Sequence, residues 1–399
     1  MIRSDLSVAM PAYVREALGR LEQSGYEAYA VGGCVRDSLL GREPSDWDIC
    51  TSALPEQTQA VFHAHRVVPT GVRHGTVTVI LDEPLEITTY RIDGAYSDCR
   101  RPAQVTFTDR LVEDLRRRDF TVNAMALSRE GRVFDAFGGL DDLNQKIIRC
   151  VGDAETRFEE DALRIMRAVR FAATLGFTVE EATERAVHKR RDNLKKIAVE
   201  RVQAELTRLL GGHCAPVLVR FADVLAAVLP EAVLTEAAAE RIERASSLAV
   251  KLALLTRGSD PEAVLRRLRY PNAVIAQAVC AARYPAAGIR PDLPAMRRLL
   301  GACGEADALA VLEYAALTDV LSAEGYARAA ALLEQIGARG DCVTLAQLAV
   351  DGRALGAQLG LTGRAVGEVL DRLLQAVIDG KIPNEPGALL QYAQSTIIY

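Results

Sequence analysis

The character of the sequence changes near residue 150, and this change limits the folds that the chain can adopt. Before residue 150, short runs rich in Val, Ile, Thr and Tyr are separated by Gly, Pro and Asp, a pattern that predicts strands and turns. These runs cover residues 28–31, 47–50, 76–81, 85–92 and 104–108. After residue 150, the sequence is rich in Ala, Leu, Arg and Glu with helical periodicity and has no convincing strand. We therefore expect an α+β head with a mixed sheet, followed by a long all-α part.

Breaks that contain Gly and Pro divide the helical part further. They lie near residues 211–216, 285–294 and 337–341. Together with the change near residue 150, they predict a head at 1–150, a helical neck at 151–212, a helical body at 213–336 and a helical tail at 337–399.

Composition and charge exclude several classes of protein. The chain has 399 residues, of which 49% are apolar and 25% charged, as in globular proteins. No apolar run reaches the ~18 residues of a membrane-spanning helix, and the N-terminus lacks a signal-peptide pattern, so we expect no membrane partner. The eight cysteines are scattered without a CxxC pair, which predicts reduced thiols in a cytoplasmic protein rather than a zinc site or disulfide framework.

The net charge of −5 makes binding of nucleic acid by bulk charge unexpected, so any such surface must be local. The segment 185–208 is the candidate, because it carries eight Lys and Arg residues against three acidic ones. It is either an RNA-binding surface or the solvated face of a helix.

Two glycines, Gly32 and Gly33, lie between the predicted strand at 28–31 and a predicted helix. Backbone N–H groups at such a turn can approach phosphate oxygens, and the N-terminus of the helix favours negative charge. Arg36 lies one helical turn further on and can reach the same phosphates. For two glycines alone, a tight turn without a ligand is the alternative.

Two carboxylates follow at Asp46 and Asp48, on the next predicted strand. Residues two positions apart on a strand point to the same face, where two carboxylates repel each other unless a cation lies between them. Ligands that are all oxygen suit Mg²⁺, which also binds substrate phosphates. Such pairs also occur by chance, but the glycine turn ten residues upstream favours a metal site.

Glu86 is a candidate third acid in this site. It lies in the predicted hairpin of 76–81 and 85–92, on the polar face of its strand. If the hairpin lies beside the strand of Asp46 and Asp48, Glu86 is a third metal ligand or a base for a hydroxyl nucleophile. Otherwise it is an exposed strand glutamate.

The segment 160–175 predicts one amphipathic helix with Asp161 and Arg164 one turn apart on its polar side. The predicted buried arc consists of Ile165, Met166, Val169, Ala172 and Ala173. The two polar residues could form a plain surface ion pair. Alternatively, a carboxylate accepts from the amino group of cytosine or adenine while a guanidinium donates to the adjacent ring nitrogen. Uracil and guanine would leave the carboxylate unsatisfied, so such a pair could discriminate between bases.

The motifs around these residues resemble those of class II tRNA nucleotidyltransferases (CCA-adding enzymes) and the related bacterial poly(A) polymerases. The resemblance follows the family's order over about residues 25–210 and is looser at 345–352 and 377–385. Its motifs are Gly32-Gly33-Cys34-Val35-Arg36-Asp37, Asp46-Trp47-Asp48, and the segments 73–79, 86–91, 117–124, 135–139, 160–164, 167–171, 200–201 and 205–206.

The resemblance implies a polymerase-β-like head and untemplated addition of CCA to the 3′ end of tRNA from CTP and ATP. It implies that Asp46 and Asp48 hold Mg²⁺ for attack of the tRNA 3′-hydroxyl on the nucleotide α-phosphate, and that the tail binds tRNA. DNA is not an expected partner. The implied nucleotide contacts are Gly33, Arg36, Arg118, Asp161, Arg164, Arg167 and Arg170, with Gly32, Asp119 and Asn123 as further candidates.

Geometry qualifies some of these contacts. On an ideal helix, Arg167 can still reach a triphosphate beside Arg164, whereas Arg170 lies nearly opposite Asp161. Asp119 could hold ribose together with Asn123 or could equally cap a helix.

Several activities remain open within the family. The segment 93–102 matches the flexible loop with which the family switches from C to A, and a CC-adding enzyme lacks this loop. The short segment before the first motif and the absence of a basic C-terminal tail favour CCA addition over polyadenylation. A non-catalytic RNA-binding homologue would lack Asp46, Asp48 or Arg164, and all three are present. The order of addition, the tRNA contacts of the C-terminal half and the oligomeric state stay open.

Overall fold

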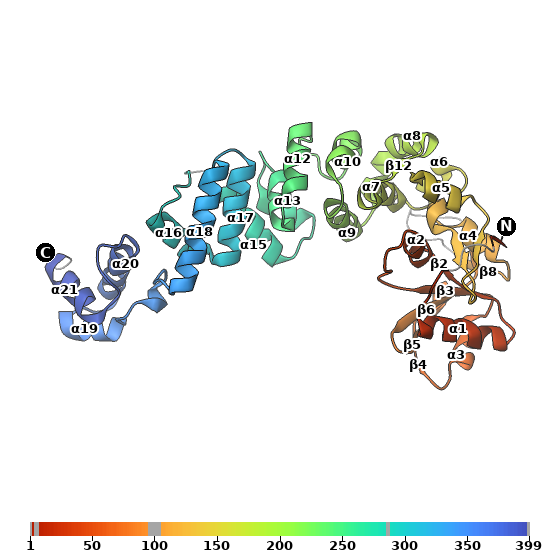
Figure 1. Cartoon of the computed structure of the whole chain (residues 1–399), viewed down its shortest axis with the longest axis horizontal. Helices are drawn as coiled ribbons and strands as arrows, with labels where there is room; N and C mark the ends of the chain where they lie inside the picture. Colours follow the sequence, from red (N-terminus) through yellow and green to blue (C-terminus); the bar gives the residue numbers. More distant parts are fainter. Residues whose placement is uncertain (1, 4–7, 95–104, 285–287, 397–399) are drawn as a thin grey trace. The chain divides into compact units, whose positions relative to one another are not determined.

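The computed structural model describes residues 2–3, 8–94, 105–284 and 288–396 (Figure 1). The chain forms two compact units, Met1–Pro230 and Glu231–Tyr399, which we describe one at a time. The first unit therefore contains the predicted head and neck and continues to Pro230. The finer division into four parts stays a prediction.

An eight-stranded mixed sheet forms the head. Its strand order is β1-β10-β9-β2-β3-β6-β5-β4, and among these neighbours only β3 and β6 run parallel. The strands are β1 (Ile2–Arg3), β2 (Ala28–Val31), β3 (Asp48–Thr51), β4 (Arg66–Gly71), β5 (Thr76–Ile80), β6 (Pro84–Thr89), β9 (Met125–Leu127) and β10 (Val133–Asp135). The predicted mixed sheet is confirmed.

Two small two-stranded sheets correct the sequence-based strand assignments. The predicted strand at 85–92 is divided, because β6 ends at Thr89 and β7 (Arg91–Asp93) pairs instead with β8 (Val105–Phe107). Tyr90, between them, is fully buried. The expectation of no strand after residue 150 is wrong by one short element, since β12 (Thr178–Val179) pairs with β11 (Ile147–Ile148).

Helices cover both sides of the large sheet (Figure 1). Helices α1 and α3 contact each other and the strands on one side, and α2 contacts β2 and β9 on the other. The helices of this unit are α1 (Ala12–Gln23), α2 (Gly33–Leu39), α3 (Pro55–Val61), α4 (Leu111–Arg116), α5 (Gly139–Gln145), α6 (Ala154–Glu160), α7 (Leu163–Leu175), α8 (Glu181–Arg190), α9 (Val199–Leu210), α10 (Ala215–Arg220) and α11 (Ala222–Ala226). Three 3₁₀ turns accompany them: η1 (Val72–His74), η2 (Thr121–Asn123) and η3 (Arg191–Lys196).

The predicted helix at 160–175 is broken at its start. Helix α6 ends at Glu160, Asp161 has extended backbone angles (φ −135°, ψ 102°), and α7 begins at Leu163. Asp161 accepts a hydrogen bond from Leu163 N at 3.1 Å, the local bonding by which Asp favours helix starts over helix interiors. The predicted buried arc of α7 is confirmed, since all five of its residues are at most 5% exposed.

The second unit is helical throughout the residues that the structure describes. Its helices are α12 (Glu236–Arg244), α13 (Leu248–Leu255), α14 (Pro261–Arg267), α15 (Asn272–Arg283), α16 (Leu293–Cys303), α17 (Glu305–Leu317), α18 (Ala323–Arg339), α19 (Gly352–Leu359), α20 (Arg364–Ile378) and α21 (Pro386–Thr396), with the 3₁₀ turn η5 (Leu345–Gln347). One apolar core lies among α16–α18 and another among α19–α21. Arg297 of α16 joins the two cores, because it bonds to Asp341 at 2.7 Å and to Ile378 O at 3.1 Å. In the described parts of both units, no helix combines the length and apolar character needed to cross a membrane.

Gly139, the first residue of α5, provides a test of head packing. A Cβ at this position would lie 2.3 Å from the backbone oxygen of Thr121, in η2. We expect Gly139→Ala to lower the free energy of unfolding by about 1–3 kcal/mol, because the backbone must shift. The measurement is urea unfolding followed by the fluorescence of Trp47, the one tryptophan of the chain. Gly19→Ala in α1 is the control: its Cβ would make an ordinary 3.5 Å contact, so this change should be neutral or stabilising. Equal effects of the two changes would contradict the packing argument.

Candidate active site

The glycine turn brings Arg118 and Asp48 together in the head. Gly32 has φ 86°, a value that favours glycine, and it precedes the first residue of α2. A Cβ on Gly32 would lie 3.1 Å from Arg118 Nη1 and 4.0 Å from Asp48 Oδ2. The predicted order of strand, glycine turn and helix is confirmed, and it leaves the Gly32 backbone open toward a guanidinium and a carboxylate.

Asp46 lies in the loop before β3, which corrects the prediction that both aspartates belong to the strand. The expected alternation still holds, because Asp46 and Asp48 are exposed while Trp47 and Ile49 are buried. Asp46 Oδ1 accepts a hydrogen bond from Ser45 Oγ at 3.0 Å. The carboxylate also lines an open cleft of about 1020 Å³.

Glu86 lies directly opposite Asp48 on the neighbouring parallel strand, so the predicted adjacency of hairpin and strand is confirmed. Its side chain is exposed, whereas Leu85 and Ile87 are buried. Desolvation and the charges of Asp46 and Glu86 raise the pKa of Asp48 to about 6, against the opposing charge of Arg118. The negative charges of Asp46 and Glu86 thus both act on Asp48, which is unfavourable without a cation.

The donor set fits a hard cation that takes few protein ligands. Carboxylate oxygens are the preferred ligands of Mg²⁺, which commonly uses one or two of them together with phosphates and water. Within the described ranges, no group of three or more His, Cys, Asp or Glu residues is close enough to enclose a metal by itself. Asp46 and Asp48 thus fit a site that a substrate phosphate would complete.

Asp114, which the sequence analysis missed, fixes the position of Arg118. Its carboxylate is fully buried; Oδ1 accepts from Arg117 Nη2 at 2.7 Å and Oδ2 from Arg118 Nη2 at 3.2 Å. Arg118 Nε is also buried, with no hydrogen-bond partner in the described part of the chain. The available signal was the spacing, since an acid three and four residues before two arginines forms ion pairs on a helix.

Asp119 joins the head to α7 of the neck. Its Oδ1 accepts from Phe120 N at 2.8 Å and from Asn123 Nδ2 at 3.1 Å, while its Oδ2 accepts from Arg167 Nε at 2.7 Å. Asp119 therefore organises η2, which corrects the alternative that it caps a regular helix. Asn123 Oδ1 in turn accepts from Arg36 Nη1 at 2.6 Å, so Arg36 is held by this network.

Arg170 points into the protein, and its predicted place opposite Asp161 on one helix does not apply, because Asp161 lies outside α7. Its Nε lies 2.5 Å from Glu205 Oε2 of α9, and both side chains are buried. Its guanidinium also stacks 3.8 Å from the ring centre of Phe171. Arg170 thus packs α7 against α9.

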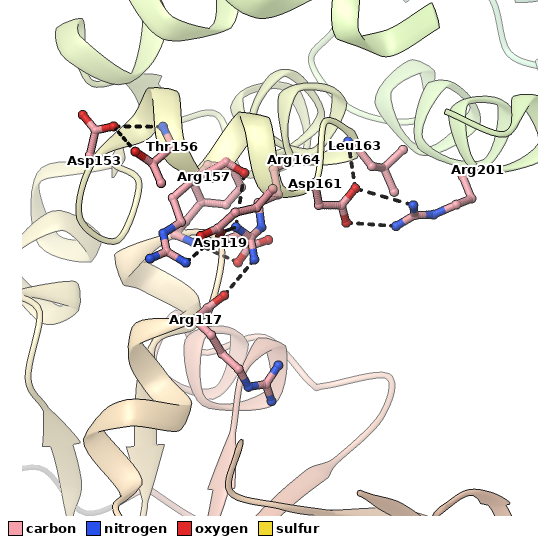
Figure 2. A network of polar contacts seen from close by, with 11 residues as sticks. Arg117, Asp119, Asp153, Thr156, Arg157, Asp161, Leu163, Arg164 and Arg201 are labelled. Carbon is pink, nitrogen blue, oxygen red and sulfur yellow. Dashed lines mark hydrogen bonds and ion pairs between the residues drawn. The ribbon is translucent and has the colours of Figure 1, made fainter. Parts of the chain in front are cut away.

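Asp161 and Arg164 have separate ion-pair partners (Figure 2). Asp161 Oδ2 accepts from Arg201 Nη2 of α9 at 3.1 Å. Arg164 donates from Nη1 to Glu160 Oε2 at 2.7 Å and from Nη2 to the backbone oxygen of Arg117 at 2.8 Å. The predicted placement one turn apart in a single helix is wrong, because Asp161 lies in the break between α6 and α7.

The basic segment 185–208 is largely neutralised within its own unit. Its ion pairs include Lys189 and Arg190 with Glu155, Lys195 with Asp192, and Arg201 with Asp161. Its positive charge is therefore less available to RNA than the sequence suggested. Most of the predicted flexible loop, residues 95–102, lies outside the described residues.

The network around Asp119 predicts a pH dependence of stability. Burial opposes ionisation of this carboxyl, but Arg167, Asn123 and Arg164 together lower its pKa to about 2, below the usual 3.8. The ionised carboxylate therefore contributes on the order of 2 kcal/mol above about pH 5, which is lost as the pH falls towards 2. We expect Asp119→Asn to have a lower free energy of unfolding than the wild type at pH 7, and we expect this difference to shrink below pH 4. The measurement is urea unfolding followed by the fluorescence of Trp47. Glu16→Gln, at an exposed pair with Arg20, is the control. A difference independent of pH would contradict this prediction.

Comparisons with known proteins agree with this geometry. Family models match at residues 28–149 (poly A polymerase head domain), 176–232 (probable RNA and SrmB-binding site of polymerase A) and 241–393 (tRNA nucleotidyltransferase domain 2, putative). The chain is 52% identical over 200 residues to the CCA-adding enzyme of Leuconostoc mesenteroides, an alignment that covers 50% of this chain and 49% of that protein. It thus spans about half the length of that curated relative.

Two further comparisons cover nearly the whole chain. The CCA-adding enzyme of Geobacillus stearothermophilus is 39% identical over 386 residues, which cover 93% of this chain and 94% of that protein. The crystal structure of the Bacillus stearothermophilus CCA-adding enzyme in complex with CTP matches with a TM-score of 0.83 and 34% identity, covering 97% of this chain and 98% of that one. The resemblance found in the sequence motifs is confirmed, and the chain belongs to the family of CCA-adding enzymes.

Proposed function

We propose that this protein is a tRNA nucleotidyltransferase that adds C, C and A to the 3′ end of tRNA from CTP and ATP without a nucleic-acid template. One observation carries the proposal: the first unit holds both a carboxylate cluster beside a glycine turn and a separate pair of base-reading candidates, Asp161 and Arg164. The names of the relatives, CCA-adding enzymes, support the same activity.

The reaction is attack of the tRNA 3′-hydroxyl on the nucleotide α-phosphate, with pyrophosphate as the leaving group. Asp46 and Asp48 would hold Mg²⁺, with Glu86 as a third ligand or as a base for the hydroxyl. A divalent cation at this place supplies Lewis-acid polarisation of the phosphate and stabilises the charge on the leaving group. Arg118 and the backbone N–H groups of Gly32 and Gly33 would donate hydrogen bonds to the phosphates.

Base choice falls to Asp161 and Arg164. An ionised Asp161 can only accept hydrogen bonds, so it pairs with the amino group of cytosine or adenine and is left unsatisfied by the carbonyl of uracil or guanine. Arg164 donates to the neighbouring ring nitrogen. Arg36, Arg167 and Arg170 stay candidates, although each would have to exchange a partner described above to reach a nucleotide.

tRNA is the proposed macromolecular partner. The match of 176–232 to a probable RNA-binding model supports an RNA path along the neck, which A-form RNA would follow by shape and backbone. We also propose that the tail contacts tRNA. The cytoplasm is the proposed location, where the seven free cysteines of the described residues would stay reduced.

The decisive experiment uses tRNA that lacks its last three nucleotides, incubated with each NTP alone and in combination. We expect CTP alone to add two residues, CTP with ATP to add three, and UTP or GTP to add none. Long tracts of A would instead identify a poly(A) polymerase. A product that stops after two C residues would identify a CC-adding enzyme, and addition of A only to tRNA that already ends in CC would identify an A-adding enzyme. Binding without incorporation would identify a non-catalytic homologue.

The metal assignment predicts the effect of removing either aspartate. We expect Asp46→Ala or Asp48→Ala to reduce incorporation about a thousandfold or more, because charge on the phosphates loses its stabilisation, while tRNA binding persists. Titration with Mn²⁺, followed by its electron paramagnetic resonance signal, should show the loss of a bound ion in both variants. Glu43→Ala, an exposed acid in the same loop, is the control. Incorporation at the wild-type rate by either aspartate variant would refute the assignment.

A further inference from the structure

Arg201 contacts the base-reading carboxylate directly. It lies on α9, and its guanidinium turns towards the break between α6 and α7, where Asp161 sits (Figure 2). Arg201 Nη2 donates to Asp161 Oδ2 at 3.1 Å, and Nη1 lies 3.5 Å from Oδ1. The Asp161 side chain is only 18% exposed in this contact. Arg201 thus faces inward instead of adding to a basic outer surface.

The backbone of Asp161 is held, because its N–H donates to Arg157 O at 3.3 Å and its carbonyl oxygen accepts from Arg164 N at 3.0 Å, but these bonds do not orient the carboxylate. It is in extended conformation at the C-terminal end of α6, outside both helices. Besides Arg201, the bond from Leu163 N to Oδ1 orients the carboxylate. An ionised carboxylate has about four acceptor positions, so these contacts leave capacity for an exocyclic amino group in a defined direction.

Arg164 is held by a different set of groups. Its guanidinium donates to Glu160 Oε2 at 2.7 Å, to the backbone oxygen of Arg157 at 3.2 Å and to the backbone oxygen of Arg117 at 2.8 Å. These groups belong to α6 and to the head, not to α9. A change at Arg201 therefore disturbs the acceptor half of the base-reading pair and leaves the donor half in place.

We propose that Arg201 is a positioning residue for base selection: it holds the Asp161 carboxylate in the orientation that accepts the amino group of cytosine or adenine. This inference rests on the proposed function of the site. Arg201 acts through Asp161 and does not itself touch the nucleotide. Without it, Asp161 can rotate, and the penalty against uracil and guanine weakens.

The test measures kcat/KM for CTP and for UTP in the first addition to tRNA that lacks its last three nucleotides. We expect Arg201→Met, which keeps length and removes charge, to lower the CTP-to-UTP ratio about tenfold, the usual effect of losing a charged hydrogen bond. Arg129→Met is the matched control, because Arg129 forms a comparable, partly exposed pair with Glu22 in the head at 2.8 Å. The control should keep the wild-type ratio.

A double-mutant cycle separates positioning from a general structural role. If Arg201 acts through Asp161, adding Arg201→Met to Asp161→Ala should change the ratio little further. An unchanged ratio in Arg201→Met, or an equal further loss in the Asp161→Ala background, would overturn the proposal.

Should Arg201→Met fail to fold, Arg201→Lys takes its place, with a smaller loss of the CTP-to-UTP ratio expected because a single ammonium cannot span both carboxylate oxygens. An unchanged ratio in Arg201→Lys would then overturn the proposal. Failure of the wild type to add C would instead refute the proposed function itself.

Discussion

The buried carboxylate of Asp119 is the interaction on which the rest of the site depends. One of its oxygens holds the turn η2 through Asn123, and the other binds Arg167 of the neck. Through Asn123 the same network reaches Arg36, behind the glycine turn. A single residue thereby ties η2 of the head to α7, because burial of an ion requires its partners to stay in place.

Charge compensation is the second theme of the first unit. Asp114 binds Arg117 and Arg118, Glu205 binds Arg170, and Glu160 binds Arg164. Arg118 and Arg164 are therefore held in fixed orientations, which would reduce the entropy lost if they bind a nucleotide as proposed. Asp46, Asp48 and Glu86 differ from these pairs: their like charges repel each other in the protein alone, and the proposed cation would offset that repulsion.

Patterns within short stretches of the sequence predicted those features of the fold that short stretches determine. The glycine turn, the hairpin with Glu86 and the buried arc of α7 follow from periodicity and turn chemistry within about ten residues. Arg201 was not assigned to the site, because its partner Asp161 lies 40 residues earlier in the sequence and becomes visible only when the chain is folded. Asp114 was missed although its spacing to Arg117 and Arg118 was a local signal. Strands β9 and β10, of three residues each, are too short to show alternation. The break at Asp161 escaped notice because the apolar spacing of α7 extends back into α6 without interruption.

The extended backbone at Asp161 has a consequence for how this family could diversify. A substitution there changes no helix interior, since the residue lies between two helices, but it removes the contacts of the carboxylate with Leu163 N and with Arg201 of α9. Arg164, in contrast, is built into α7 and bonded to the head through Arg117. Under the proposed function, a change on the acceptor side would therefore leave the guanidinium of Arg201 without its carboxylate and would call for a second change on α9. A change on the donor side would instead remove a bond between α7 and the head.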